Sequence, residues 1–255
     1  MNHIWIFLFL NNFLEPILNG KIFSDISEKI KNLLELDENS LKPRFFFTHK
    51  EYNGEWSLWD TIDNIPFDQE AFKRSSMEIE VIIHDINEKF NVGNYITDLS
   101  QAVVTRNEKL MVLIVDWSKG SKKPLLFIND HAKRTTEWIA YRLLLLVEKS
   151  VINPKNIKFI GKGFGAHLAG MTSKYLIHHS IIVERIIALN PTITMMISRD
   201  KSVRLDSSDA KQTVSIFTEI GLIFFNSFSL NPFSIDTYII NGGEFQPNCY
   251  NPFKS

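Results

Sequence analysis

An uninterrupted apolar run at Leu110–Val115 (LMVLIV) constrains the fold of this chain more than any other segment. Apolar residues without polar alternation are typical of a strand that is buried on both faces of a parallel sheet. Parallel neighbours require crossover connections, usually helices, and the flanking sequence supplies both kinds of element in alternation. We expect strands at 44–48, 78–84, 157–160 and 183–189, and helices at 94–105, 135–149 and 166–177. This order predicts a parallel α/β sheet.

Composition limits the kinds of partner and site. The 255 residues are 44% hydrophobic and 22% charged, which is sufficient for one large domain, and neither internal repeats nor a linker divide them. Lys and Arg total 28 against 29 Asp and Glu, so the chain lacks the basic field that nucleic-acid binding requires. Its single cysteine, Cys249, excludes an internal disulfide and a thiolate metal cluster.

The N-terminus carries a second apolar run, Ile4–Leu10, which Glu15-Pro16 stops. The run is too short to span a bilayer but has the length of a signal-peptide core, and Asn19-Gly20 offers a small residue for cleavage. We therefore predict a signal peptide over 1–20, a secreted protein, and one domain over 21–255. The alternative is a buried N-terminal helix or strand, because no Lys or Arg precedes the apolar core.

The junction between the expected strand 157–160 and the expected helix 166–177 reads FIGKGFGAHLAG. Gly161 and Gly165 bracket a tight turn where side chains would strike the neighbouring strand and helix. Their spacing is that of the nucleophile elbow, G-x-S-x-G, but Gly163 occupies the central position. The alternative is a generic glycine-rich turn for phosphate, which is weak here because no lysine follows the last glycine.

Several ordered motifs, from about Phe46 to Cys249, resemble those of the pancreatic-lipase family of secreted lipases and phospholipases A1. The family's GHSLGAHIAG is matched by GKGFGAHLAG at 161–170, its VDWS by 115–118, its LDPA by LNPT at 189–192, its RLDPSDA by RLDSSDA at 204–210, and its DFYPNGGxxQPGC by 236–249. The resemblance implies an α/β-hydrolase fold, with a mostly parallel sheet and helices on both faces. It also implies truncation at the C-terminus.

The resemblance also implies that the catalytic residues are missing. Gly163 stands where the family has its serine nucleophile, so no acyl-enzyme forms there. Asn190 stands where the family has the aspartate of LDPA, and an amide lacks the charge that stabilises the imidazolium. The family's histidine lies beyond the QPGC motif, whereas the last histidine of this sequence is His179. We therefore predict no catalytic residue and no enzymatic activity.

The oxyanion site is expected to be damaged as well. Family members carry glycine after the histidine that ends an earlier strand, but here His84 is followed by Asp85. Asp85 and Ile86 would be the remains of the oxyanion loop, where a carboxylate opposes a developing negative charge unless it turns to solvent. The other donor of the family, the N–H after the nucleophile position, would be that of Phe164 and is expected to persist.

Other candidate residues have structural interpretations. His167 is expected to pack inward, Asp116 to anchor a loop at its strand end, and His178-His179 to end a helix rather than bind zinc. No metal site and no cofactor are predicted. An aromatic group after residue 221 is either core or a surface that contacts lipid or a partner. The candidate contact residues in this group are Phe224, Phe225 and Phe228.

The resemblance therefore implies a secreted, inactive lipase homologue that binds a lipid, an acyl compound or a protein, with peripheral membrane contact left open. Storage, carriage and interference with host lipids all fit, and the family includes yolk proteins of flies that lack the serine. The alternative is a residual carboxylic-ester hydrolase that uses displaced residues, although no G-x-S-x-G occurs. In the family the QPGC cysteine pairs with a later one, so Cys249 is expected to be a free thiol or a dimer bridge.

Overall fold

The structure is a computed structural model that describes residues 42–49, 57–58, 77–91, 93–107, 109–122, 128–191, 200–218, 234–243 and 246–247. All of them fall within Lys42–Ser255, one of the two units into which the chain divides. The expected signal peptide over 1–20, the aromatic residues Phe224, Phe225 and Phe228, and Cys249 lie outside the described residues. Among the described helices, none combines the length and the apolar character needed to cross a membrane.

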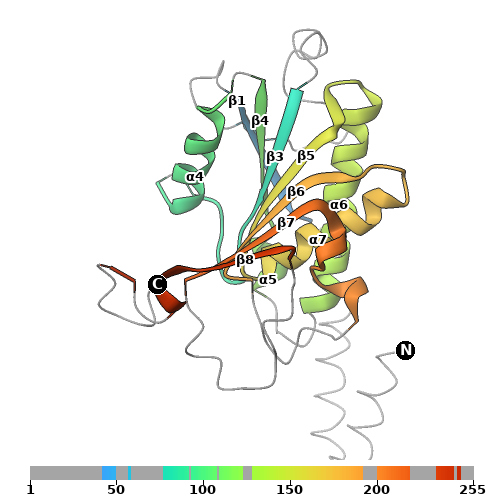
Figure 1. The fold of residues 1–255 in the computed structure, drawn as a ribbon. Coiled ribbons are helices and arrows are strands. Elements are labelled where there is room, and N and C mark those ends of the chain that lie inside the picture. The colour runs from blue at the N-terminus through green and yellow to red at the C-terminus, as the bar shows by residue number, and fades with distance from the viewer. Residues whose placement is uncertain are drawn as a thin grey trace, which may run out of the picture. The chain divides into compact units, whose positions relative to one another are not determined.

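Within the described residues, eight strands form one sheet in the order β2-β1-β4-β3-β5-β6-β7-β8 (Figure 1). The strands are β1 (Arg44–His49), β2 (Ser57–Leu58), β3 (Met77–Ile83), β4 (Leu110–Asp116), β5 (Ile152–Lys162), β6 (Val183–Leu189), β7 (Ala210–Phe217) and β8 (Asp236–Ile239). Pairing is parallel from β4 to β8, whereas β1 runs antiparallel to both β2 and β4. The predicted α/β fold with a mostly parallel sheet is confirmed.

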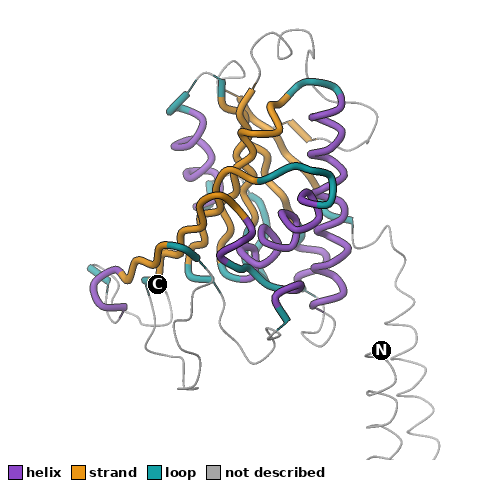
Figure 2. Tube along the Cα trace, turned by 45° about the vertical axis from the view of Figure 1, so that its right-hand side comes forward, coloured by secondary structure: helices purple, strands orange, loops and turns teal. Residues whose placement is uncertain are grey.

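Helices cover both faces of the sheet (Figure 2). Helix α4 (Tyr95–Val104) packs on one face, and α6 (Ile128–Glu148) and α7 (Phe164–Ile177) pack on the other, together with the short α5 (Ser118–Ser121). The side chains of β3 alternate between the two layers, because Val81 and Ile83 join the α6–α7 layer and Ile82 joins the α4 layer. Three short 3-10 helices complete the described elements: η5 (Lys201–Val203), η6 (Ser207–Asp209) and η7 (Ile240–Gly243).

The boundaries of two predicted elements differ from the structure. Helix α6 begins at Ile128 rather than at residue 135, because its first two turns carry polar residues that obscure the apolar period. Strand β5 begins at Ile152 rather than at residue 157, and its pairing with β3 shifts register between Met77 and Ile79. The proline in this irregular segment, Pro154, made the strand hard to recognise. No strand is predicted from the sequence at β7 or β8, although the RLDSSDA motif ends at the first residue of β7 and the motif at 236–249 begins with β8.

Candidate functional site

The elbow lies where β5 ends at Lys162 and α7 begins at Phe164. Gly163 has φ 54° and ψ −120°, a backbone conformation that side chains rarely adopt. A Cβ added to Gly161 would lie 2.5 Å from Ala166 Cα, and one added to Gly165 would lie 2.4 Å from the carbonyl oxygen of Ile83. The sharp turn therefore depends on glycine at 161 and 165, since backbone atoms occupy the space of a side chain.

The carboxylate of Asp85 sits on this elbow. Its Oδ1 accepts hydrogen bonds from the backbone N–H of Phe164 at 2.8 Å and from the backbone N–H of Ile86 at 2.7 Å. A Cβ added to Gly163 would lie 2.0 Å from Asp85 Oδ2 and 2.1 Å from Asp85 Cγ. The carboxylate thus points into the elbow rather than to solvent, and it fills the space that a side chain at 163 would need.

The charge of Asp85 is disfavoured by its surroundings. Burial raises the pKa of Asp85 above its usual value, and the nearby carboxylate of Glu88 acts in the same direction. The hydrogen bonds from the N–H groups of Phe164 and Ile86 stabilise the ionised form and offset part of this rise, as does Lys162. The two N–H donors therefore stabilise the negative charge of Asp85, as such donors stabilise an oxyanion.

A second layer of polar residues surrounds Asp85. Glu88 Oε2 accepts hydrogen bonds from the backbone N–H of Asp85 at 3.0 Å and from Tyr95 Oη at 2.5 Å. Its Oε1 pairs with Lys162 Nζ at 2.5 Å, and that ammonium lies 4.5 Å from the centroid of the Tyr95 ring. Burial opposes the charge of Glu88, but these hydrogen bonds outweigh it and lower its pKa. Burial and Glu88 raise the pKa of Tyr95.

Sequence reasoning missed this second layer. Glu88 lies in the loop after β3, Tyr95 is the first residue of α4, and Lys162 is the last residue of β5. The only signal was Lys162 itself, since the family motif GHSLG has histidine at that place. The ion pair joins residues that are 74 positions apart, so the pattern of neighbouring residues could not indicate it.

Asn190, which the resemblance places at the family's acid position, hydrogen-bonds to the residue that follows β7. Its Nδ2 donates to Thr218 Oγ1 at 2.6 Å, and its Oδ1 accepts from the backbone N–H of Thr218 at 2.6 Å. Its own backbone N–H donates to the carbonyl of Ile216 at 2.8 Å, and its φ is 43°. Both ends of the amide therefore join the end of β6 to the end of β7.

A buried network joins the ends of β3 and β4. His84 Nε2 lies 3.2 Å from Asp116 Oδ1, and the indole N–H of Trp117 donates to the carbonyl of His84 at 2.8 Å. Asp116 also accepts from the backbone N–H of Ser118 and pairs with Arg44. Burial opposes the charge of Asp116, but these partners hold its pKa well below the usual range. Asp116 thus anchors the loop after β4, as predicted.

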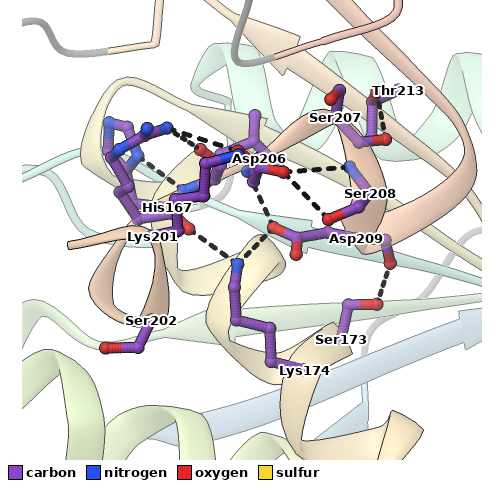
Figure 3. Close-up of polar contacts among 12 residues, drawn as sticks. His167, Ser173, Lys174, Lys201, Ser202, Asp206, Ser207, Ser208, Asp209 and Thr213 are labelled. Carbon is purple, nitrogen blue, oxygen red and sulfur yellow. Dashed lines mark hydrogen bonds and ion pairs between the residues drawn. The ribbon is translucent and has the colours of Figure 1, made fainter. Parts of the chain in front are cut away.

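The RLDSSDA segment packs against α7 (Figure 3). His167 is fully buried and accepts a hydrogen bond from the backbone N–H of Leu205 at 3.1 Å, so its predicted inward packing is confirmed. Asp209 Oδ2 accepts from Lys174 Nζ at 2.6 Å and from the backbone N–H of Asp206 at 2.8 Å. Burial outweighs the attraction of Lys174 and raises the pKa of Asp209 to about 6. This cluster fastens the segment before β7 onto α7.

The adjacent histidines His178 and His179 lie at the C-terminal end of α7. His178 caps the C-terminal end of α7, and His179 Nδ1 lies 3.2 Å from the carbonyl of Tyr175. Among the residues that the structure describes, no three His, Cys, Asp or Glu side chains gather closely enough to hold a metal ion.

Comparisons with known proteins point to one family. A family model described as Lipase matches residues 22–255. Pancreatic lipase-related protein 2 of Cavia porcellus is 26% identical over 232 residues, which cover 90% of this chain and 52% of that protein. The probable phospholipase A1 magnifin of Vespa magnifica is 29% identical over 189 residues, which cover 70% of this chain and 54% of that protein. The chain spans about half the length of these curated relatives.

The solved structures that resemble this chain do so at lower similarity. A phospholipase/carboxylesterase from Dyadobacter fermentans DSM 18053 is 12% identical, with a TM-score of 0.42 over 69% of this chain and 71% of that chain. The match of the family model to residues 22–255 includes the elbow between β5 and α7 as well as the ends of β3 and β6. The chain therefore belongs to the lipase family.

Proposed function

We propose that this protein is a non-hydrolytic member of the lipase family that acts by binding a lipid or acyl compound, with a protein partner as the other class of ligand. The observation that carries the proposal is the position of the Asp85 carboxylate, whose Oδ1 engages the N–H groups of Phe164 and Ile86. No hydroxyl accompanies it at Gly163. The elbow thus holds an acceptor where ester hydrolysis needs a nucleophile and free donors.

Electrostatics support the loss of hydrolysis. Attack on an ester creates an oxyanion that must take hydrogen bonds from donors already in place. At this elbow both donors are engaged, and a second negative charge within hydrogen-bonding distance of Asp85 would be repelled. Asn190 adds to the loss, because its amide is bound to Thr218 and carries no charge to stabilise a protonated base.

The proposed ligand class comes from the family. The relatives are named for lipase and phospholipase A1 activity, so lipid is the class of compound that a retained binding surface would accept. Secretion, with removal of residues 1–20, belongs to the same proposal. The proposal extends to contact with a membrane surface and to a dimer that is linked through Cys249.

The experiment combines a reactive probe with lipid analysis. Purified protein is treated with a fluorophosphonate and assayed with a short-chain p-nitrophenyl ester, and its organic extract is examined by mass spectrometry. We expect no covalent adduct, no hydrolysis above the heat-denatured blank, and lipid that is absent from an unrelated protein purified in parallel. Covalent labelling with turnover would instead establish the residual hydrolase that uses displaced residues.

A further inference from the structure

Strand β8, one of the two edge strands of the described sheet, carries a group of exposed apolar side chains (Figure 1). The group is Ile235, Tyr238, Ile239 and Ile240, which are 59%, 55%, 38% and 40% exposed. Four of the ten exposed large hydrophobic residues in the described part of the chain therefore fall within the segment 235–240. Such a concentration of apolar surface at a sheet edge is typical of an interaction surface.

The backbone of β8 also presents hydrogen-bonding groups at this edge. Within the described residues, no strand pairs with the side of β8 that faces away from β7. The N–H of Ile235 donates to the carbonyl of Thr213 at 3.0 Å, and β8 pairs in parallel with β7. Because the backbone groups of a strand point alternately toward and away from its neighbour, those of Asp236 and Tyr238 point away from β7. The outer edge therefore offers donors and acceptors to a further strand.

Strand β8 lacks features that commonly protect a sheet edge from pairing. Its residues, Asp236–Ile239, include neither lysine nor proline, and its pairing with β7 proceeds without a register shift. Strand β2, at the opposite edge, is only two residues long, which itself limits pairing. Of the two edges, β8 is thus the one that is suited to the addition of a strand.

We propose that β8 pairs with β8 of a second copy of this chain, antiparallel about a two-fold axis at Tyr238, so that two sheets join into one. A two-fold contact uses the same surface on both copies, so their exposed apolar side chains cover each other. The axis sets the two Tyr238 side chains opposite each other as an aromatic pair. The only charged residue of the strand, Asp236, lies at its first position. Antiparallel pairing therefore places the two aspartates at opposite ends of the contact and avoids repulsion between like charges.

A contact through one short strand is weak. Four paired residues bury far less surface than a permanent dimer interface, so we expect a dimer Kd on the order of 100 µM. Dilute protein therefore exposes β8, and concentrated protein covers it. The inference goes beyond the proposed function, because the contact requires neither a lipid nor a disulfide through Cys249.

The first test measures association of the full chain carrying Cys249→Ser, which removes the single cysteine and with it any disulfide-linked dimer. Sedimentation velocity from about 5 to about 500 µM should show a monomer–dimer equilibrium. Tyr238→Lys, which sets two like charges at the axis, should raise the Kd at least about tenfold. Tyr141→Lys is the matched control, because Tyr141 is a similarly exposed tyrosine (49%) on α6 and should leave the Kd unchanged. A protein that stays monomeric throughout, or equal effects of the two substitutions, overturns the inference.

Introduced cysteines test the position of the axis in the same Cys249→Ser background. Tyr238→Cys should form an intermolecular disulfide under mild oxidation, because the two cysteines would face each other with their Cα atoms about 5.5 Å apart. Ile235→Cys is the control, since Ile235 is similarly exposed but would lie about 20 Å from its copy. Equal cross-linking at the two positions would contradict pairing about Tyr238.

Hydrogen exchange of the unmodified protein distinguishes the occupants of this edge. Peptides that contain Asp236–Ile239 should exchange about threefold more slowly at 500 µM than at 5 µM, whereas exchange of Val81–Ile83 should stay constant. Protection of β8 that rises instead with phosphatidylcholine vesicles, at constant protein concentration, would indicate a lipid surface and overturn the inference. Failure of the dimer would leave the proposed function intact, because ester turnover and bound lipid are measured independently of association.

Discussion

At the scale of single residues, Asp85 and Gly163 are complementary. The carboxylate occupies the space that a side chain at 163 would need, and the absence of a Cβ at 163 lets it reach the N–H of Phe164. Glycine also relieves the strain that the elbow conformation imposes on other residues, which is on the order of 1–3 kcal/mol. The aspartate at 85 and the glycine at 163, both of which depart from the family pattern, are therefore structurally dependent on each other.

Gly163→Ser should leave the protein inactive and lower its free energy of unfolding by on the order of 3 kcal/mol, because backbone strain adds to overlap with Asp85. Urea denaturation and an ester assay measure the two effects. Ester hydrolysis by this single variant would contradict the prediction.

Gly93→Ser is the matched control for backbone strain. Gly93 also has a positive φ, 86°, but a Cβ there would meet no atom within 4 Å. We expect Gly93→Ser to lower the free energy of unfolding by less than Gly163→Ser does. In a double-mutant cycle, Asp85→Gly should reduce the destabilisation by Gly163→Ser by about 1 kcal/mol or more. Equal costs at the two glycines, or strict additivity in the cycle, would show that Asp85 does not exclude a side chain at 163.

The carboxyl of Asp209 should titrate near pH 6, well above the usual aspartate range, because burial outweighs Lys174. The native state then binds a proton more tightly than the unfolded state, so the contribution of Asp209 to stability is largest at low pH and is lost as pH rises through about 6. Relative to Asp209→Asn, the unmodified protein should lose free energy of unfolding by up to about 1.4 kcal/mol per pH unit as the pH rises from the usual aspartate pKa to about 6. Carboxyl chemical shifts and urea denaturation test this, and titration below pH 4 would contradict it.

At the scale of elements, helix α7 is positioned by close approach. Its residue Gly170 faces the RLDSSDA segment, where a Cβ would lie 2.5 Å from Asp209 Oδ2 and 2.7 Å from Leu205 Cα. His167, Ser173 and Lys174 then donate or accept hydrogen bonds along the same contact. The same helix that begins at the elbow therefore also fixes the segment leading into β7.

Gly170→Ala should lower the free energy of unfolding by roughly 1–3 kcal/mol, although alanine is the better helix former by about 1 kcal/mol. The reason is that the added methyl group meets the backbone of Leu205, which cannot move aside as a flexible side chain would. Gly120→Ala in α5 is the control, since its Cβ would meet His131 Cβ at an ordinary 3.6 Å. Stabilisation by Gly170→Ala in urea denaturation would contradict the packing described for α7.

At the scale of the whole molecule, the sheet differs sharply in burial from its centre to its edge. Strands β3 and β4 lie between other strands and are covered by helices on both faces, and their apolar residues are almost completely buried. In contrast, all residues of β8 are exposed, and β8 is one of the two edge strands of the sheet within the described residues. Protection from solvent should therefore be uneven along the sheet.

Hydrogen exchange should follow this gradient. Amides of Val81–Ile83 should exchange only through global unfolding, and those of Thr237–Ile239 should exchange orders of magnitude faster through local opening. Mass spectrometry of peptides from a timed exchange measures both groups in one experiment. Equal protection of the two strands would show that β8 is covered in solution.

Much of the architecture followed from the sequence because its signals are local. The apolar run of β4, the helical period of α4 and the glycine spacing at 161–165 each depend on residues close together in the chain. The lack of a hydroxyl at Gly163 and of a charge at Asn190 was also evident, because the residue type alone decides both. The predicted boundaries were wrong where polar residues obscured the helical period, as in α6, or where a proline interrupted the apolar pattern of a strand, as in β5.

The direction of the Asp85 side chain could be decided only by the tertiary structure. A carboxylate at that position can turn to solvent or into the elbow, and both are compatible with the same local sequence. Pairing of β3 with β5 brings Asp85 beside Gly163, and donors from two elements then hold its oxygen. The sequence by itself determined that residue 163 carries no side chain, and the fold determined that the Asp85 carboxylate occupies the space beside it, because hydrogen bonds between residues 79 positions apart exist only after the sheet has formed.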